Sequence, residues 1–84
     1  MRALFKDKND GTLFVAELSR VVYLPEPDGN MLYCITASKD DILIQMSPNA
    51  AENAIKTLFE HDKVDFSDYE AEINTWDEHF NTED

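Results

Sequence analysis

The 84-residue chain is poor in cysteine, glycine and basic residues, and each shortage excludes a class of protein. A single cysteine, Cys34, excludes a disulfide framework within the chain, so we expect a reducing, cytoplasmic setting. Gly11 and Gly29 are the only glycines and both stand in turn-like sequences, so no glycine-rich loop is available to cradle a phosphate. Only 7 Lys and Arg accompany 18 Asp and Glu, which gives a formal net charge of -11. Direct nucleic-acid binding, which needs a basic footprint, is therefore not expected.

Long hydrophobic runs are also missing. The longest apolar runs have four or five residues, far fewer than the roughly 20 that span a bilayer. The first residues are apolar over too short a stretch for the core of a signal peptide, and the acidity disfavours adhesion to an anionic membrane. Apolar residues nevertheless make up 43% of the chain, which is enough for a core, and the length predicts a single domain over residues 1–84.

The first half of the chain alternates short apolar segments with turns, which predicts four strands between about residues 2 and 46. Asp10-Gly11 is a strong hairpin signal, and residues 25–30 and 38–41 have the composition of loops. Short connections between successive strands favour an antiparallel meander. The segment 12–24 is long for one strand, so we expect a bulge or bend between Glu17 and Arg20. The even positions of this segment form an apolar row: Phe14, Ala16, Leu18, Val22 and Leu24.

The second half has a helical period. Ser47-Pro48 is a helix start, and an apolar face repeats every three or four residues through about residue 61. This face contains Ala51, Ala54, Ile55, Leu58 and Phe59. Ser67 with Glu70 forms a capping box for a second helix over about residues 68–80, followed by a frayed tail at 81–84. Its apolar stripe contains Tyr69, Ile73, Trp76 and Phe80. The predicted fold is α+β, a four-stranded antiparallel meander followed by two helices packed on one sheet face.

No residue pattern points to a catalytic, cofactor or metal site. Cys34 stands in the middle of an apolar strand, which is typical of a buried structural thiol. His61 and His79 have no carboxylate or histidine three or four residues before them to share a metal site. Residues 7–11 resemble part of a calcium loop, but lysines would occupy two ligand positions. We therefore expect no enzyme, while carboxylates brought together in space remain an open alternative.

Charge is the remaining signal, and it is concentrated near the end of the sequence. Residues 60–84 contain ten acidic residues and one lysine, for a net charge of -9, whereas residues 1–59 carry -2. Five carboxylates along a helix over 68–80 would fall about one every 4 Å, close to the spacing of about 3.4 Å between phosphates of one DNA strand. Such a face either only promotes solubility or docks into a basic groove of a partner. The candidate partner-binding residues are Asp65, Asp68, Glu70, Glu72, Asp77 and Glu78, with Asp40 and Asp41 at the rim.

In size, acidity and predicted plan, the chain is similar to small phage-encoded inhibitors of host defence nucleases, including some anti-CRISPR proteins. The resemblance covers the whole chain but includes no specific motif, so it assigns no residue a role. It implies an inhibitor that occludes the basic, nucleic-acid-binding surface of a partner protein in the manner of a DNA mimic. The alternative expectation is a small structural or assembly subunit that forms a homodimer or a complex through the aromatic helix stripe or a sheet edge.

Overall fold

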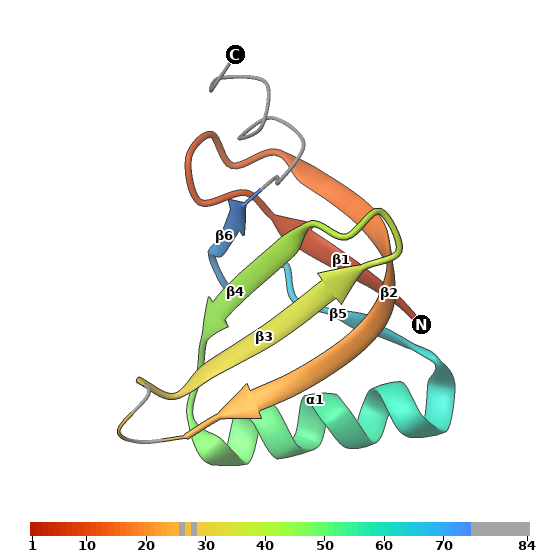
Figure 1. Cartoon of the computed structure of the whole chain (residues 1–84), viewed down its shortest axis with the longest axis vertical. Coiled ribbons are helices and arrows are strands. Elements are labelled where there is room, and N and C mark those ends of the chain that lie inside the picture. Colours follow the sequence, from red (N-terminus) through yellow and green to blue (C-terminus); the bar gives the residue numbers. More distant parts are fainter. Residues whose placement is uncertain (26, 28, 75–84) are drawn as a thin grey trace.

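The computed structural model describes residues 1–25, 27 and 29–74 of the chain (Figure 1). Six strands form one curled, mixed sheet in the order β5-β1-β2-β3-β4-β6. Within the described part of the chain, no helix is long and apolar enough to cross a membrane. The elements are β1 (Arg2–Lys6), β2 (Leu13–Leu24), β3 (Met31–Thr36), β4 (Asp41–Gln45), α1 (Pro48–His61), β5 (Lys63–Asp65) and β6 (Ala71–Asn74).

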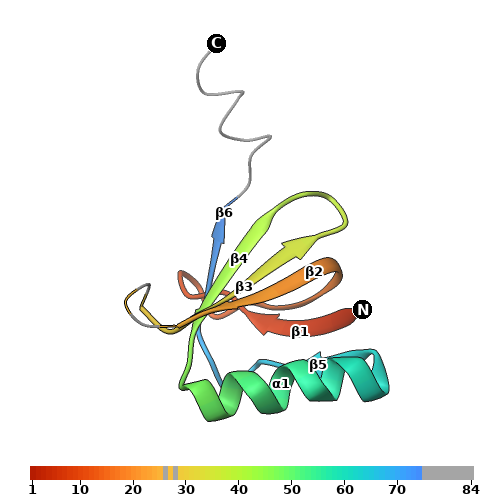
Figure 2. The same cartoon turned by 60° about the horizontal axis from the view of Figure 1, so that its bottom comes forward.

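The sheet curls into a partly closed barrel. Strands β1 to β4 pair antiparallel in sequence order, β5 joins β1 in parallel, and β6 pairs antiparallel with β4. Asp7, the residue after β1, forms a parallel bridge with Ala71, and the Lys8 amide donates to the Ala71 carbonyl oxygen at 2.9 Å. One end of the strand order thus comes back to the extension of β1. Helix α1 lies across one end of the curled sheet (Figures 1 and 2).

The core fills the inside of this curl. Phe5 has no exposed surface, and its ring stacks on those of Phe14 and Phe66 at centroid distances of 5.4 and 5.6 Å. Strands β3 and β4 contribute Leu32, Cys34, Ile42 and Ile44 to the same cluster. Helix α1 closes it with small side chains at Ala51 and Ala54 and with Leu58, which allows the helix backbone to approach the sheet closely.

Helix α1 begins and ends at residues with defined capping chemistry. The Ser47 hydroxyl accepts from the Ala50 amide at 3.3 Å, and Pro48 stands at the start of the helix, as the sequence predicts. At the other end Asp62 takes a left-handed conformation with φ 61°, and its amide donates to the Leu58 carbonyl oxygen. This conformation redirects the chain at once into β5.

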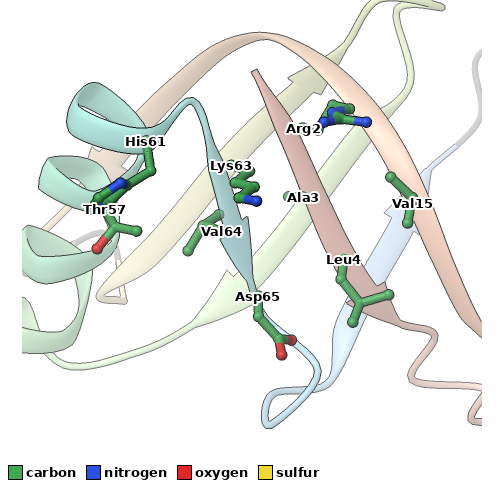
Figure 3. Close-up of a pocket in the computed structure, with 9 residues that line it drawn as sticks. All are labelled: Arg2, Ala3, Leu4, Val15, Thr57, His61, Lys63, Val64 and Asp65. Atoms are coloured by element: carbon green, nitrogen blue, oxygen red, sulfur yellow. The ribbon is translucent and has the colours of Figure 1, made fainter.

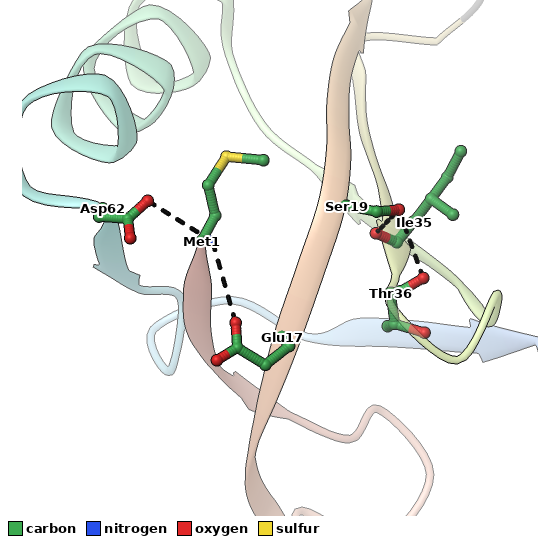
Figure 4. Close-up of polar contacts among 6 residues, drawn as sticks. All are labelled: Met1, Glu17, Ser19, Ile35, Thr36 and Asp62. Atoms are coloured by element: carbon green, nitrogen blue, oxygen red, sulfur yellow. Dashed lines mark hydrogen bonds and ion pairs between the residues drawn. The ribbon is translucent and has the colours of Figure 1, made fainter.

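A bulge in β2 reverses which residues of that strand face inward. The register with β3 passes from Leu18 opposite Thr36 to Arg20 opposite Ile35, leaving Ser19 as the extra residue. The Ser19 hydroxyl donates to the Ile35 and Thr36 carbonyl oxygens, at 3.2 and 3.4 Å (Figure 4). The predicted bulge is thus confirmed, but the single apolar row of even positions is wrong. Before Ser19 the inward side chains are Phe14, Ala16 and Leu18, and after it they are Val21 and Tyr23.

The predicted fold class, a four-stranded meander with two helices on one face, is wrong. The structure adds two strands and contains one helix within the described residues. Instead of the second helix, the chain turns at Ser67 and then forms β6. Pairing with β4 satisfies the backbone of Ala71–Asn74 and turns Ala71 and Ile73 toward the core, whereas a single 13-residue helix is marginally stable by itself. Residues 75–84, with Trp76, Phe80 and the tail at 81–84, lie outside the described residues.

Candidate functional site

A group of partly exposed apolar side chains lies on the outward side of β3, β4 and the second half of β2. Three positions form a row across the sheet, because Val22 pairs with Tyr33 and Tyr33 pairs with Leu43. All of its members are partly exposed, and none belongs to the buried core. No other element of the described chain lies over β3 and β4 on this side (Figure 1). We call this surface the outer face; it comprises Val22, Leu24, Met31, Tyr33, Ile35 and Leu43.

The outer face exists because β3 is apolar on both of its sides. Leu32 and Cys34 point into the core with no exposed surface, and the alternating positions Met31, Tyr33 and Ile35 point outward. An antiparallel strand with one solvated side usually places polar residues at the outward positions. The uninterrupted apolar run from 31 to 35 is therefore the sequence signal for this surface. It does not identify what covers the outward side of β3.

Acidic side chains border the outer face along β6. Glu72 is the register partner of Leu43. Glu70 and Glu72 line a pocket of about 270 Å³ together with Met31, Leu43, the basic Lys8 and the polar Gln45. The structure thus brings two of the predicted partner-binding carboxylates to the edge of an apolar surface, which is the arrangement of a polar rim around an interface core.

Asp41 forms a further polar margin. It pairs in register with Ile35, and its carboxylate accepts a hydrogen bond from the Tyr33 hydroxyl. This hydrogen bond, with smaller contributions from burial and from the negative charge of Asp41, raises the pKa of Tyr33 above its ordinary value. The phenol therefore stays neutral well into the alkaline range and presents an aromatic ring held by a polar anchor.

The other predicted partner-binding residues do not join Glu70 and Glu72 in this pocket. Asp65 lies in β5, and its pKa is lowered first by a hydrogen bond with the Ser67 side chain and then by the Ser67 amide, which donates to its carboxylate at 2.8 Å. Asp68 is an exposed residue of the turn that follows. Asp77 and Glu78 lie outside the described residues. The spacing of carboxylates along a helix, which suggested a match to DNA phosphates, is absent over residues 68–74.

The aromatic stripe proposed as a dimer surface is also rearranged. Tyr69 and Ile73 pack against the core, so they do not form an exposed stripe. Large apolar side chains are exposed elsewhere: Phe59 on α1 is 91% exposed and Ile55 is 38% exposed, although both were assigned to the buried helix face. The buried side of the helix, formed by Ala51, Ala54 and Leu58, is thus narrower than the predicted apolar face.

Cys34 and the two histidines are the side chains weighed for nucleophilic or metal chemistry. Cys34 is fully buried, as its position in the middle of a strand predicts, and burial raises the pKa of its thiol to about 12. A thiol with that pKa is almost never present as the reactive thiolate at neutral pH. Within residues 1–25, 27 and 29–74, no group of three or more His, Cys, Asp or Glu side chains could hold a metal ion. His61 is exposed at the end of α1, and His79 lies outside the described residues.

No protein-family model matches the chain, and no curated protein or solved structure shows significant similarity to it. The outer face with its acidic border is therefore the feature from which a function can be inferred.

Proposed function

We propose that the chain is a non-enzymatic interaction protein that binds a partner protein through the outer face. The observation that carries this proposal is the set of six apolar side chains on an uncovered side of the sheet. Small monomeric proteins rarely leave a contiguous apolar surface of this kind without a binding role. An apolar centre with a polar rim is also the usual anatomy of a protein interface.

The charge of the chain specifies the chemistry of the partner. Glu70 and Glu72 flank the apolar centre, and the chain as a whole carries -11. A partner with basic residues around an apolar patch would be attracted at long range and then paired at the rim. Such basic surfaces are common on nucleic-acid-binding proteins. The proposed action is occlusion of that surface, as an inhibitor would achieve it, and it does not require the carboxylates to follow the phosphate spacing of DNA.

The experiment compares two identical charge reversals at different places. The partner is isolated by affinity capture on the wild-type chain, and its binding is then measured by calorimetry at low and high salt. Glu72→Lys, at the rim, should weaken binding mainly at low salt, because it replaces attraction by repulsion. Glu60→Lys, the matched control on the exposed surface of α1, should change binding little. Equal effects of the two variants would show that only net charge matters.

A third variant tests the apolar centre itself. Leu43→Asn keeps the charge and approximate size of the side chain but removes apolar contact area from the outer face next to Glu72. We expect it to weaken binding at both low and high salt, because burial of apolar surface depends little on ionic strength. Unchanged affinity of this variant, with an intact circular dichroism spectrum, would refute the outer face as the binding site.

Self-assembly is the second candidate function, and exposed Phe59 is the observation that favours it. A phenylalanine that is 91% exposed four residues after the partly exposed Ile55 forms an apolar ridge on α1. Two copies that packed these ridges together would still have to overcome the repulsion between chains of charge -11. Analytical ultracentrifugation distinguishes the candidates: a dimer that Phe59→Ser dissociates would favour assembly.

A further inference from the structure

A second surface combines apolar and basic side chains on the outward side of β5, β1 and the first half of β2. Leu13 and Val15 are 58% and 65% exposed there, and Leu4 lies next to Val15 in the register of β1 with β2. Figure 3 shows Arg2, Leu4 and Val15 on neighbouring strands, with Lys63 on β5. We call this the basic-apolar surface; it comprises Arg2, Leu4, Lys6, Leu13, Val15 and Lys63.

The basic residues of this surface make no close ion pair within the described part of the chain, although Arg2 stands opposite Glu17. Arg2 and Lys63 are direct register partners on neighbouring parallel strands, so their like charges stand side by side. Among the described residues, no ion pair joins Arg2, Lys6 or Lys63 to a carboxylate. Three of the seven Lys and Arg residues of an otherwise acidic chain are therefore gathered around exposed aliphatic side chains. An anionic ligand with apolar groups would relieve the repulsion and cover the apolar area.

The two carboxylates nearest to this surface already have partners. Glu17, opposite Arg2, lies 3.8 Å from the Met1 amino group, which is also 3.5 Å from the Asp62 carboxylate (Figure 4). Asp65, opposite Leu4, accepts from the Ser67 amide. A pocket of about 520 Å³ lies beside Leu4, Val15 and Lys63 and extends to His61 at the end of α1.

We propose that residues 75–84 of this same chain dock on the basic-apolar surface. Their sequence has the complementary chemistry, with Trp76 and Phe80 four residues apart, no Lys or Arg, and four carboxylates at Asp77, Glu78, Glu83 and Asp84. The two aromatic side chains cover Leu13 and Val15, and the carboxylates pair with the basic residues. The segment thereby occupies a surface that any other acidic, aromatic peptide would have to compete for.

The position of β6 makes this docking possible within one molecule. Asp7 bridges Ala71 at the start of β6, and Asp7 directly follows Lys6 of the basic-apolar surface. The segment follows Asn74, three residues further along β6. Ten residues reach at most about 33 Å when extended, which covers a return along β1. The covalent connection also gives the segment a high effective concentration at the surface.

Trp76 is the only tryptophan, so its fluorescence reports the docking directly in the full-length chain. We expect its emission to lie at shorter wavelength, and its quenching by acrylamide to be weaker, than in a synthetic peptide of residues 75–84. Val15→Asp and Lys6→Glu should each return both signals toward the peptide values. Val15→Asp removes an apolar contact of the aromatic side chains, and Lys6→Glu reverses a charge that pairs with the carboxylates. Arg20→Glu is the matched control, since this exposed basic residue lies on the other half of β2 and should leave the signals unchanged.

Three results would overturn the proposal. The first is a wild-type chain in which Trp76 behaves as it does in the free peptide. The second is a protected Trp76 that Val15→Asp and Lys6→Glu leave protected while circular dichroism shows the variants to be folded; it would place the segment elsewhere. The third is protection that disappears on dilution, which would assign the surface to the segment of a second copy. Protection that is independent of concentration and lost in both variants supports docking within one chain.

Discussion

The buried thiol of Cys34 should make the stability of this protein depend on alkaline pH. Cys34 lies in β3 with no exposed surface, and burial raises its pKa from 9.0 to about 12 because the interior cannot solvate a thiolate. A pKa that is raised in the folded state means that the folded protein holds the proton more tightly than the unfolded chain. The resulting stabilisation is complete below pH 9.0 and is lost as the pH rises through the interval up to about 12.

The size of the loss follows from the difference between the two pKa values. Each pKa unit corresponds to about 1.36 kcal/mol, so the free energy of unfolding should fall by about 1.4 kcal/mol between pH 7 and pH 10 and by about 2.7 kcal/mol between pH 7 and pH 11. Small domains have a total stability of roughly 5–15 kcal/mol. Ionisation of this one thiol is thus large enough to be measured and small enough to leave the chain folded at pH 10.

The assay is urea unfolding followed by circular dichroism at pH 7, 10 and 11, under reducing conditions, for the wild-type chain and Cys34→Ala. Removal of the sulfur leaves a small cavity and should cost about 1 kcal/mol at pH 7. Tyrosines and lysines titrate in both proteins, so the difference between the two pH dependences isolates the thiol. The stabilities of the two proteins should converge and then cross as the pH rises. Parallel pH dependences would refute the assignment of Cys34 as a buried, neutral thiol.

Three other predictions concern the core, the first hairpin and the outer face. Phe5→Ala should lower the free energy of unfolding by about 3–5 kcal/mol, because this fully buried ring stacks on two others, whereas Phe59→Ala on the exposed ridge should change it little in the same denaturation assay. Gly11→Ala should cost about 1–2 kcal/mol, since Gly11 has φ +75° and a side chain there is strained whatever space surrounds it. In a spectrophotometric titration, Tyr33 should ionise at a pKa above 10.0, and Asp41→Asn should lower that pKa by removing the charged acceptor; an unchanged titration curve would exclude the hydrogen bond.

Local chemistry was sufficient to predict the first four strands and α1. Asp10-Gly11 allows the tight turn between β1 and β2, and the Gly11 amide donates to the Asp7 carbonyl oxygen at 2.8 Å. Ser47 and Pro48 define the start of α1, because the Ser47 side chain caps an amide only three residues away, that of Ala50. Each of these elements depends on interactions between residues close in sequence, which composition and spacing record directly.

The fate of residues 68–74 depends on a distant strand and could not be predicted in this way. Tyr69 and Ile73 fit a helical period, but Ala71 and Ile73 fit the alternation of a strand equally well. The unpaired edge of β4 decides between them, because it offers hydrogen-bond partners to Ala71–Asn74. Tertiary pairing of this kind overrides local propensity and leaves no mark in the local sequence.

The candidate site was predictable only in part. Charge alone pointed to Glu70 and Glu72, because acidity is visible in the sequence. The contribution of β2 to the outer face was not visible, since the alternation of the sequence places Val22 and Leu24 in the same row as Phe14. The register with β3 shows that Ser19 is one residue more than the pairing needs. This extra residue places Val22 and Leu24 on the outward side.

The bulge at Ser19 makes the character of the surface depend on the register of β2 with β3 as well as on the identity of its residues. If the ladder continued from Leu18 without a bulge, with Ser19 opposite Ile35, Val22 and Leu24 would turn inward, while Val21 and Tyr23 would turn outward in their place. Composition, charge and hydropathy would not change, yet the phenol of Tyr23 would leave its hydrogen bond with Asn30 and join the outer face. In this fold a shift of register by a single residue can therefore exchange part of the outer face for part of the core, which no substitution of one side chain can do.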